Sequence, residues 1–365
     1  MSERDNSISI LKGIGIILVI IGHSCCPPLL YSIIYSFHMP LFFIASGYFF
    51  KEKYLTQKKT FVVNKIKKLY LPFVIWSVVF LLLHNLFYKV GIINSLYGTQ
   101  SGTTSHWYPI KEILLSFVDI VTRMNSYEQF LLGAYWFLRS LFIGSILFCL
   151  VSFLFSKICK TTKQAVLCST TIFLLLSGLL KFFSITIPLI PQGGYRELMA
   201  AVFLGIGFLI HQEPTISFLK KVPCIILSMA IFIFCLWLHP ASMETSAKFI
   251  DFAIIPFSGT AGFIIILYLS SLLDKLFTGS WISRFLVYVG NRTLYILTFH
   301  IIAFKPAAYL ETLIRNLDWH MIGCHAVIPR ANGWYWVVYT ISALFISLVL
   351  EKIIHAHKHN LQSSP

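Results

Sequence analysis

The sequence predicts an all-α fold, a polytopic integral membrane helical bundle of about ten transmembrane helices with both termini in the cytoplasm. Three observations lead to this prediction. Only 12% of the 365 residues are charged and 57% are hydrophobic, whereas a soluble domain carries about 25% charged residues. The mean hydropathy is +0.78, so lipid must solvate most of the surface. The apolar residues also fall into long runs separated by short basic segments.

Ten segments are long and apolar enough to cross a bilayer, which takes about 17–25 residues. The sixth, seventh and ninth are the shortest, and we expect them to be tilted, broken or extended. The whole chain, 1–365, is predicted to form one transmembrane domain with no appended soluble domain. In chain order the predicted spans are 9–26, 29–50, 69–90, 133–156, 164–183, 196–211, 223–239, 252–273, 288–304 and 333–354.

Lysine and arginine give the orientation of these spans. Sixteen basic residues lie in the two chain ends and the connections on the same side of the membrane, which are 1–8, 51–68, 157–163, 212–222, 274–287 and 355–365. The connections on the other side, 27–28, 91–132, 184–195, 240–251 and 305–332, hold 6. Basic residues concentrate on the cytoplasmic side of membrane proteins, so both termini are predicted to be inside. The net charge of +15 does not indicate nucleic-acid binding, because the lysines lie in short runs between apolar stretches and not on one basic face.

The densest predicted cytoplasmic run lies within residues 51–68. Two interpretations of it stay open: an anchor on anionic lipid, or an electrostatic funnel for an anionic donor such as a CoA ester. The run consists of Lys51, Lys53, Lys58, Lys59, Lys65, Lys67 and Lys68.

The eight cysteines form no C-x-x-C pair, so the sequence predicts neither a metal site nor a disulfide framework. Cys25 or Cys26 could pair with Cys324, because all three fall in or near predicted outer loops. The N-terminal apolar stretch is short enough for a signal peptide, but Glu3 and Asp5 dilute its basic flank. We therefore expect a retained first helix.

Two predicted outer loops, 91–132 and 305–332, are long and combine aromatic with polar side chains. This combination suits contact with a sugar ring, and it equally suits anchoring of the loop ends at the membrane interface. The residues concerned are Trp107, Tyr108, Tyr127, Glu128 and Gln129 in the first loop, and Trp319, His320, His325 and Trp334 in or beside the second.

Ionisable residues at membrane depth are costly, so each is a candidate functional residue. The clearest pair is Lys12 and His23 in the first span. They are eleven residues apart, so at 100° per residue they lie within about 20° of each other on the helix and are separated by a rise of about 16 Å. A neutral imidazole can accept a proton from a weakly acidic hydroxyl, and a cation can hold a phosphate or polarise a carbonyl. Snorkelling of Lys12 and an ordinary polar role for His23 at the helix end are the structural alternatives.

Further candidates follow along the chain. His38 precedes Pro40, which must break a backbone hydrogen bond, and such a break at membrane depth usually lines a cavity. A hydrogen bond between helices is the alternative role for His38. The remaining candidates are Arg139, the neighbours Arg196 and Glu197, Arg292 near the predicted inner face, and His300, while His355, His357 and His359 are expected to lie in a flexible tail.

Four segments, taken in order, resemble the membrane acyltransferase-3 family, which includes fucose 4-O-acetylase-like and O-antigen O-acetyltransferases. The resemblance covers most of the chain. It consists of a basic residue, ten residues and then histidine (Lys12 to His23); the run from His38 to Tyr48; Trp136-Phe137-Leu138; and Tyr295 to His300 after Gly290. Many members of the family have arginine where this chain has Lys12, and lysine lacks the bidentate guanidinium fork.

The resemblance implies an integral-membrane O-acyltransferase that moves an acetyl or other acyl group from cytoplasmic acyl-CoA, usually acetyl-CoA, to a hydroxyl of a cell-surface or lipid-linked glycan. It implies that His23 is essential, as general base or acyl carrier, with support from Lys12. We further expect His38 to take part in catalysis and Arg139, Arg196, Glu197, Arg292 and His300 to contact donor or acceptor.

The expected location is the bacterial inner (plasma) membrane. The expected partners are acyl-CoA, the glycan and the lipid bilayer, without nucleic acid; a homodimer and a single chain both stay open as the working form. The alternative function is a polysaccharide or lipid-linked sugar exporter, in which the buried histidines and arginines would line a path. A scaffold subunit of a glycan-synthesis complex is the third alternative.

Overall fold

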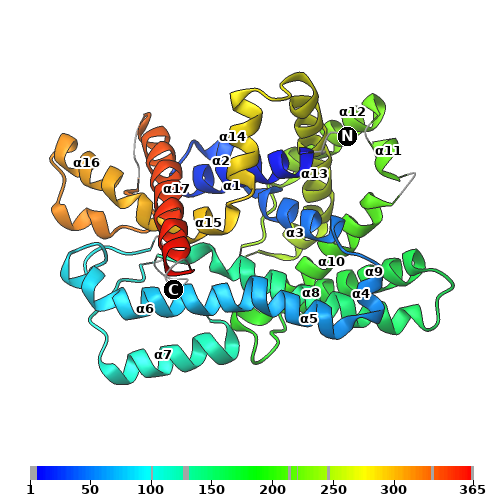
Figure 1. The fold of residues 1–365 in the computed structure, drawn as a ribbon, viewed down its shortest axis with the longest axis horizontal. Helices are drawn as coiled ribbons and strands as arrows, with labels where there is room; N and C mark the ends of the chain where they lie inside the picture. Colours follow the sequence, from blue (N-terminus) through cyan, green and yellow to red (C-terminus); the bar gives the residue numbers. More distant parts are fainter. Residues whose placement is uncertain are drawn as a thin grey trace. The chain divides into compact units, whose positions relative to one another are not determined.

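The computed structural model describes residues 6–99, 102–125, 131–212, 215–219, 221–244, 247–329 and 333–362, and the regular secondary structure within these ranges is entirely helical (Figure 1). The elements are α1 (Ser7–His23), α2 (Pro28–Tyr35), α3 (His38–Tyr48), α4 (Lys53–Thr56), α5 (Lys58–Lys65), the π-helix η1 (Ile66–Tyr70), α6 (Leu71–Lys89), α7 (Ile110–Arg123), η2 (Gly133–Tyr135), α8 (Trp136–Ser156), α9 (Thr162–Phe182), η3 (Pro191–Gly193), α10 (Tyr195–His211), α11 (Thr215–Leu219), α12 (Val222–Leu238), α13 (Phe249–Leu276), α14 (Trp281–Gly290), α15 (Thr293–Ala303), α16 (Lys305–Arg315), η4 (Trp319–Gly323) and α17 (Tyr335–Gln362).

The protein is a polytopic helical membrane protein. Within the described residues, seven helical stretches are long and apolar enough to cross a membrane, and α1 and α12 are shorter apolar helices. Each of the ten predicted spans overlaps at least one of these helices or α10. The seven stretches are Pro28–Tyr48, Lys58–Lys89, Gly133–Ser156, Thr162–Phe182, Phe249–Leu276, Thr293–Arg315 and Tyr335–Ala356.

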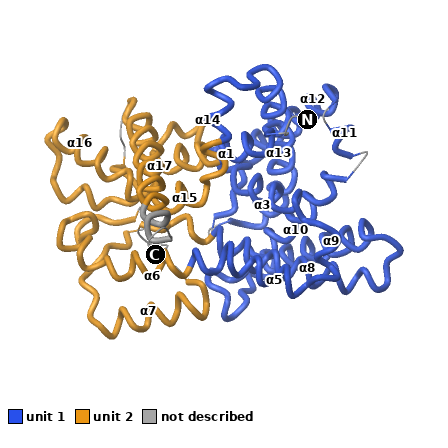
Figure 2. The backbone as a smooth tube through the Cα atoms, viewed as in Figure 1, with its two compact units in different colours: residues 1–15, 32–73, 137–287 blue, residues 16–31, 74–136, 288–365 orange. Residues whose placement is uncertain are grey.

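The chain forms two compact units, coloured separately in Figure 2. Unit 1 comprises residues 1–15, 32–73 and 137–287, and unit 2 comprises residues 16–31, 74–136 and 288–365. Several helices, α1 among them, contribute one end to each unit.

Helices α3 and α10 form the closest packing of unit 1. A Cβ atom on Gly47 would lie 2.0 Å from the carbonyl oxygen of Leu204, and one on Gly207 would lie 2.1 Å from that of Ile44. The two backbones therefore touch where both helices carry glycine, which is the usual way for helices to approach closely in a membrane. Nearby, the break between α2 and α3 leaves the carbonyl of Ser36 to accept a hydrogen bond from the Ser258 hydroxyl at 2.9 Å.

Unit 2 is built around α15, which packs along α17. The ring of Trp76 on α6 meets the ring of Phe299 edge-on, with centroids 4.9 Å apart. The Tyr135 and Thr298 hydroxyls are hydrogen-bonded at 2.6 Å in the buried interior of this unit. These contacts hold the inward face of α15, which also carries His300.

Two helices occur where the sequence analysis expects outer loops. Helix α7 lies within the loop 91–132, and α16 lies within 305–332. Both follow the 3.6-residue period, but polar residues interrupt their apolar stripes, so neither reads as a span by itself. Helix α7 leaves Ile110, Leu114 and Val118 more than half exposed, as is typical of a helix lying in a membrane interface.

Candidate functional site

Two imidazole rings meet inside unit 2. His23 is the last residue of α1, and His300 lies on α15 with none of its surface exposed. The ring centroids are 5.2 Å apart and the ring planes are inclined by 60°. The structure therefore brings together two histidines that are 277 positions apart in the sequence.

The hydrogen bonds of both rings determine which nitrogen is basic. Nδ1 of His23 lies 2.9 Å from the carbonyl oxygen of Val19, and Nδ1 of His300 lies 2.9 Å from that of Leu297. A carbonyl oxygen only accepts, so each Nδ1 carries the hydrogen and each neutral ring keeps its lone pair on Nε2. Nε2 of His300 is buried and has no hydrogen-bond partner among the described residues. Each ring of the pair can therefore accept a proton at Nε2.

A third imidazole, that of His325, belongs to the loop that follows η4 in the same unit. Burial is the main cause that lowers the pKa of His325 to about 3, and the nearby Lys305 and His23 groups act in the same direction. Lys305 is itself buried and donates to the carbonyl oxygens of Ile322 at 2.8 Å and Cys324 at 2.7 Å. The lysine thus fixes the loop that carries His325, and His325 is neutral at physiological pH.

In the described part of the chain, no group of three or more His, Cys, Asp or Glu side chains has a geometry that could hold a metal ion. All eight cysteines are free thiols, so the disulfide considered between Cys25 or Cys26 and Cys324 is not formed.

In unit 1 the structure gathers Arg139, Arg196 and Glu197. The fully buried Arg139 donates through Nε to Oε1 of Glu197 at 3.0 Å, and Ser140 donates to the same oxygen at 2.9 Å. Oε1 of Gln192 accepts from both arginines, at 3.1 Å from Arg139 and 2.6 Å from Arg196. A buried carboxylate paired in this way balances a charge that would otherwise be costly.

Two other predicted site residues lie separately in unit 1. His38 begins α3, is 2% exposed and donates through Nδ1 to the carbonyl oxygen of Ile34 at 2.8 Å. Its ring also meets the ring of Tyr35 edge-on. The side chain is therefore buried within the protein. Lys12 lies on α1, partly buried, with no carboxylate within 4 Å of its ammonium among the described residues.

Arg292 precedes α15 in unit 2. Its Nε lies 2.9 Å from Oε1 of Glu351, and its guanidinium lies 3.6 Å above the ring of Tyr288. His355 is 3.4 Å from the same carboxylate oxygen. The prediction that a flexible tail begins at residue 355 is wrong for the residues up to Gln362, because α17 continues to that residue.

The structure describes some of the aromatic residues of the two predicted outer loops. The ring of Tyr108 stacks on that of His84 with centroids 3.6 Å apart, and Trp107, Trp319 and Trp334 are at least half exposed. Tyr127, Glu128 and Gln129 lie outside the described residues.

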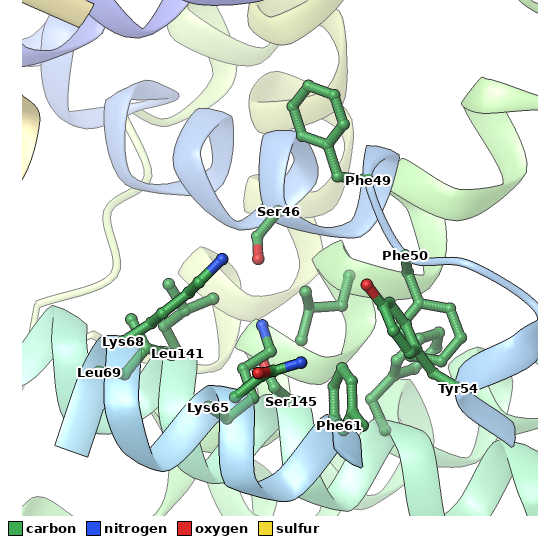
Figure 3. A pocket seen from close by; sticks show the side chains of 13 residues that line it. Ser46, Phe49, Phe50, Tyr54, Phe61, Lys65, Lys68, Leu69, Leu141 and Ser145 are labelled. Carbon is green, nitrogen blue, oxygen red and sulfur yellow. The ribbon is translucent and has the colours of Figure 1, made fainter. Parts of the chain in front are cut away.

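Unit 1 also contains a basic pocket to which the lysine run within residues 51–68 contributes. Its volume is about 310 Å³, and it lies between the end of α3, the α5–η1 helix and α8. Lys65 and Lys68 point into it from α5 and η1, and Ser46 faces them from α3 (Figure 3). The lysine run was the available signal, but Ser145 on α8 joins the pocket only through the tertiary structure.

Comparison with known proteins identifies the family. The acyltransferase domain of the acyltransferase-3 family matches residues 5–352, which is nearly the whole chain. No curated protein and no solved structure matched in the same comparisons. The match, together with the membrane-spanning helices, shows that this chain belongs to the acyltransferase-3 family and is a multi-pass membrane acyltransferase.

Proposed function

We propose that this acyltransferase moves an acetyl group from acetyl-CoA on the cytoplasmic side to a hydroxyl of a cell-surface or lipid-linked glycan in the bacterial inner membrane. The observation that supports this most is the imidazole pair: His23 and the fully buried His300 both keep their lone pair on Nε2. Acyl transfer to an alcohol needs such a base, because a sugar hydroxyl is a weak nucleophile until its proton is removed.

The proposed step balances without any further reactant. Nε2 of His23 accepts the hydroxyl proton while the sugar oxygen attacks the thioester carbonyl carbon. The new C–O bond forms, the C–S bond breaks, and the departing thiolate takes the proton from the imidazolium of His23. His300 lies close enough to stabilise the transient positive charge, since its Nε2 can accept a hydrogen bond.

Roles for the other candidates follow from their charge. Lys12, on the same helix as His23, is proposed to hold the donor or polarise its carbonyl, because its ammonium has no carboxylate partner among the described residues. Arg292 is proposed to contact the donor, and His38 is proposed to take part in catalysis. Arg139, Arg196 and Glu197 are proposed to shape the acceptor side through their shared network.

The test uses purified protein, radiolabelled acetyl-CoA and lipid-linked glycan extracted from the source membrane. We expect label to enter the glycan and to disappear with His23→Ala. His106→Ala is the matched control, because its side chain is 61% exposed and lies outside the imidazole pair. Label retained on the protein in the absence of glycan would identify His23 as an acyl carrier instead of a base.

The exporter alternative has its own readout. The same protein in liposomes would then move unlabelled glycan across the bilayer without acyl-CoA, and no label would reach the glycan. That result would reject the proposed transfer.

A further inference from the structure

The basic pocket of unit 1 contains two cations without anionic partners. Neither Lys65 nor Lys68 has a carboxylate within 4 Å among the described residues. Nζ of Lys65 lies 5.3 Å from the centre of the Phe61 ring. This cation–π contact is weak compared with an ion pair. The two lysines are three residues apart on the α5–η1 helix, so they share one face of it. Two like charges held together in this way favour binding of an anion.

A buried hydroxyl faces the same space. Ser145 on α8 is 1% exposed, lines the pocket, and its Oγ has no hydrogen-bond partner among the described residues. Buried hydroxyls are almost always hydrogen-bonded, so an unpartnered one at the wall of a cavity points to a ligand or water that completes it. Ser46 and Asn64 add further polar groups to the wall.

One side of the pocket is aromatic. The rings of Phe50, Tyr54 and Phe61 contact one another, with centroids 5.1–5.6 Å apart, and all three line the cavity (Figure 3). Aromatic rings stack on flat heteroaromatic groups such as a nucleobase. The pocket thus offers ammonium groups for a phosphate and an aromatic surface for a base.

We propose that this pocket binds the phosphorylated adenosine end of the acyl donor, with Lys65 and Lys68 on the phosphate and the aromatic wall beside the base. The inference rests on the proposed function, because it takes CoA as the source of the nucleotide. The lysine run to which the pocket belongs is predicted to lie on the cytoplasmic side, where the donor is present. The shared chemistry is a phosphate ester, which an anionic lipid headgroup could also supply.

The binding test uses the full chain in detergent with adenosine 3′,5′-bisphosphate, which is the phosphorylated adenosine portion of CoA. We expect saturable binding that weakens at least about 10-fold in Lys65→Gln and again in Lys68→Gln, since each loses one charge-assisted contact. Lys163→Gln is the matched control: it removes an equal charge from an exposed position that does not line the pocket. Ser145→Leu, which fills the cavity, should weaken binding without removing charge.

Two further arms identify the source of the phosphate. Inorganic phosphate should bind at least about 10-fold more weakly than the nucleotide, because it cannot use the aromatic wall. In nanodiscs, replacing zwitterionic lipid by anionic lipid should leave nucleotide binding unchanged. Equal affinity for inorganic phosphate, displacement of the nucleotide by anionic lipid, or lysine variants that bind like the wild type would each overturn the proposal.

This test is independent of acetyl transfer. If the protein binds the nucleotide but transfers no label, the proposal for the pocket stands and the proposed function is rejected. Label transfer with an unchanged KM for acetyl-CoA in Lys65→Gln/Lys68→Gln would retain the function and reject the pocket.

Discussion

The ring of His300 lies 5.2 Å from the ring of His23, and its Nε2 is buried without a hydrogen-bond partner in the described part of the chain. His300 therefore differs from an ordinary interior histidine, whose two nitrogens would both be satisfied. The unpartnered lone pair on Nε2 of His300 therefore belongs to a ring beside His23, which is proposed to accept the hydroxyl proton. This arrangement leads to separate expectations for the two residues.

His23→Ala should lower acetyl transfer by about 10²–10⁴-fold, which is the usual loss when a general base is removed. The protein should still fold, because His23 is the last residue of α1 and its substitution leaves the preceding turns of that helix unchanged. Single-turnover label transfer, together with size-exclusion profiles, measures both properties. Transfer at the wild-type rate in a well-folded His23→Ala protein would exclude the residue as base and as acyl carrier.

His300→Gln should keep more activity than His300→Leu, although both remove the imidazole. The glutamine carbonyl can still accept a hydrogen bond from a charged His23, whereas leucine cannot. We expect His300→Leu to lower kcat by about 10-fold or more, because a hydrogen bond to a charged group contributes about 1.5–3 kcal/mol. The KM for acetyl-CoA should not change. Steady-state kinetics of both variants provide the measurement, and equal losses in the two would indicate a packing role only.

The stability of the protein should depend on pH through His325. Its pKa is lowered to about 3 in the fold, against about 6.5 in an unfolded chain. Between these values the unfolded chain binds a proton that the folded chain does not, so the free energy of unfolding falls as pH falls from about 6.5 toward 3. Above about pH 6.5 the effect is absent.

Thermal unfolding in detergent at several pH values tests this expectation. His325→Gln should flatten the fall in apparent Tm between about pH 6.5 and pH 5. The exposed His106→Gln serves as the control for the loss of an imidazole at the surface. An identical pH profile for His325→Gln and wild type would contradict the expectation.

The Arg139–Glu197 pair should behave as a coupled unit. Glu197→Leu leaves the fully buried Arg139 without its carboxylate, and breaking a buried pair in this way costs about 3–5 kcal/mol. The double variant Arg139→Leu/Glu197→Leu should be less destabilised than Glu197→Leu alone, because no uncompensated charge remains. A double-mutant cycle of apparent Tm values checks this. Additive effects would show that the two side chains are not coupled in the membrane.

Lys12→Arg should retain most of the transfer activity, whereas Lys12→Met should lose most of it. Arginine keeps the positive charge and offers a bidentate guanidinium fork to a phosphate or carbonyl, but methionine keeps only an apolar side chain. Comparison of kcat/KM for acetyl-CoA in the two variants is the measurement. Near-wild-type values for Lys12→Met would indicate that Lys12 only snorkels to the interface.

The sequence by itself determined the all-helical membrane fold, because long apolar runs leave no alternative for backbone groups in lipid than hydrogen bonding within each helix. It also indicated which ionisable residues deserved testing, since a charge at membrane depth is costly wherever the helix lies. The helices α7 and α16 were not predicted, because polar residues interrupt their apolar stripes.

Only the tertiary structure decided which of these residues meet. Three arrangements link helices that are far apart in the chain. They are the contact between His23 and His300, the hydrogen bond from Arg139 to Glu197, and the pocket that both Lys68 and Ser145 line. Helical periodicity fixes which side chains share a face of one helix, but it does not specify which face of another helix packs against them. Close approach at Gly47 and Gly207 settles that choice in unit 1, because it requires two glycines on different helices to lie opposite each other's backbones.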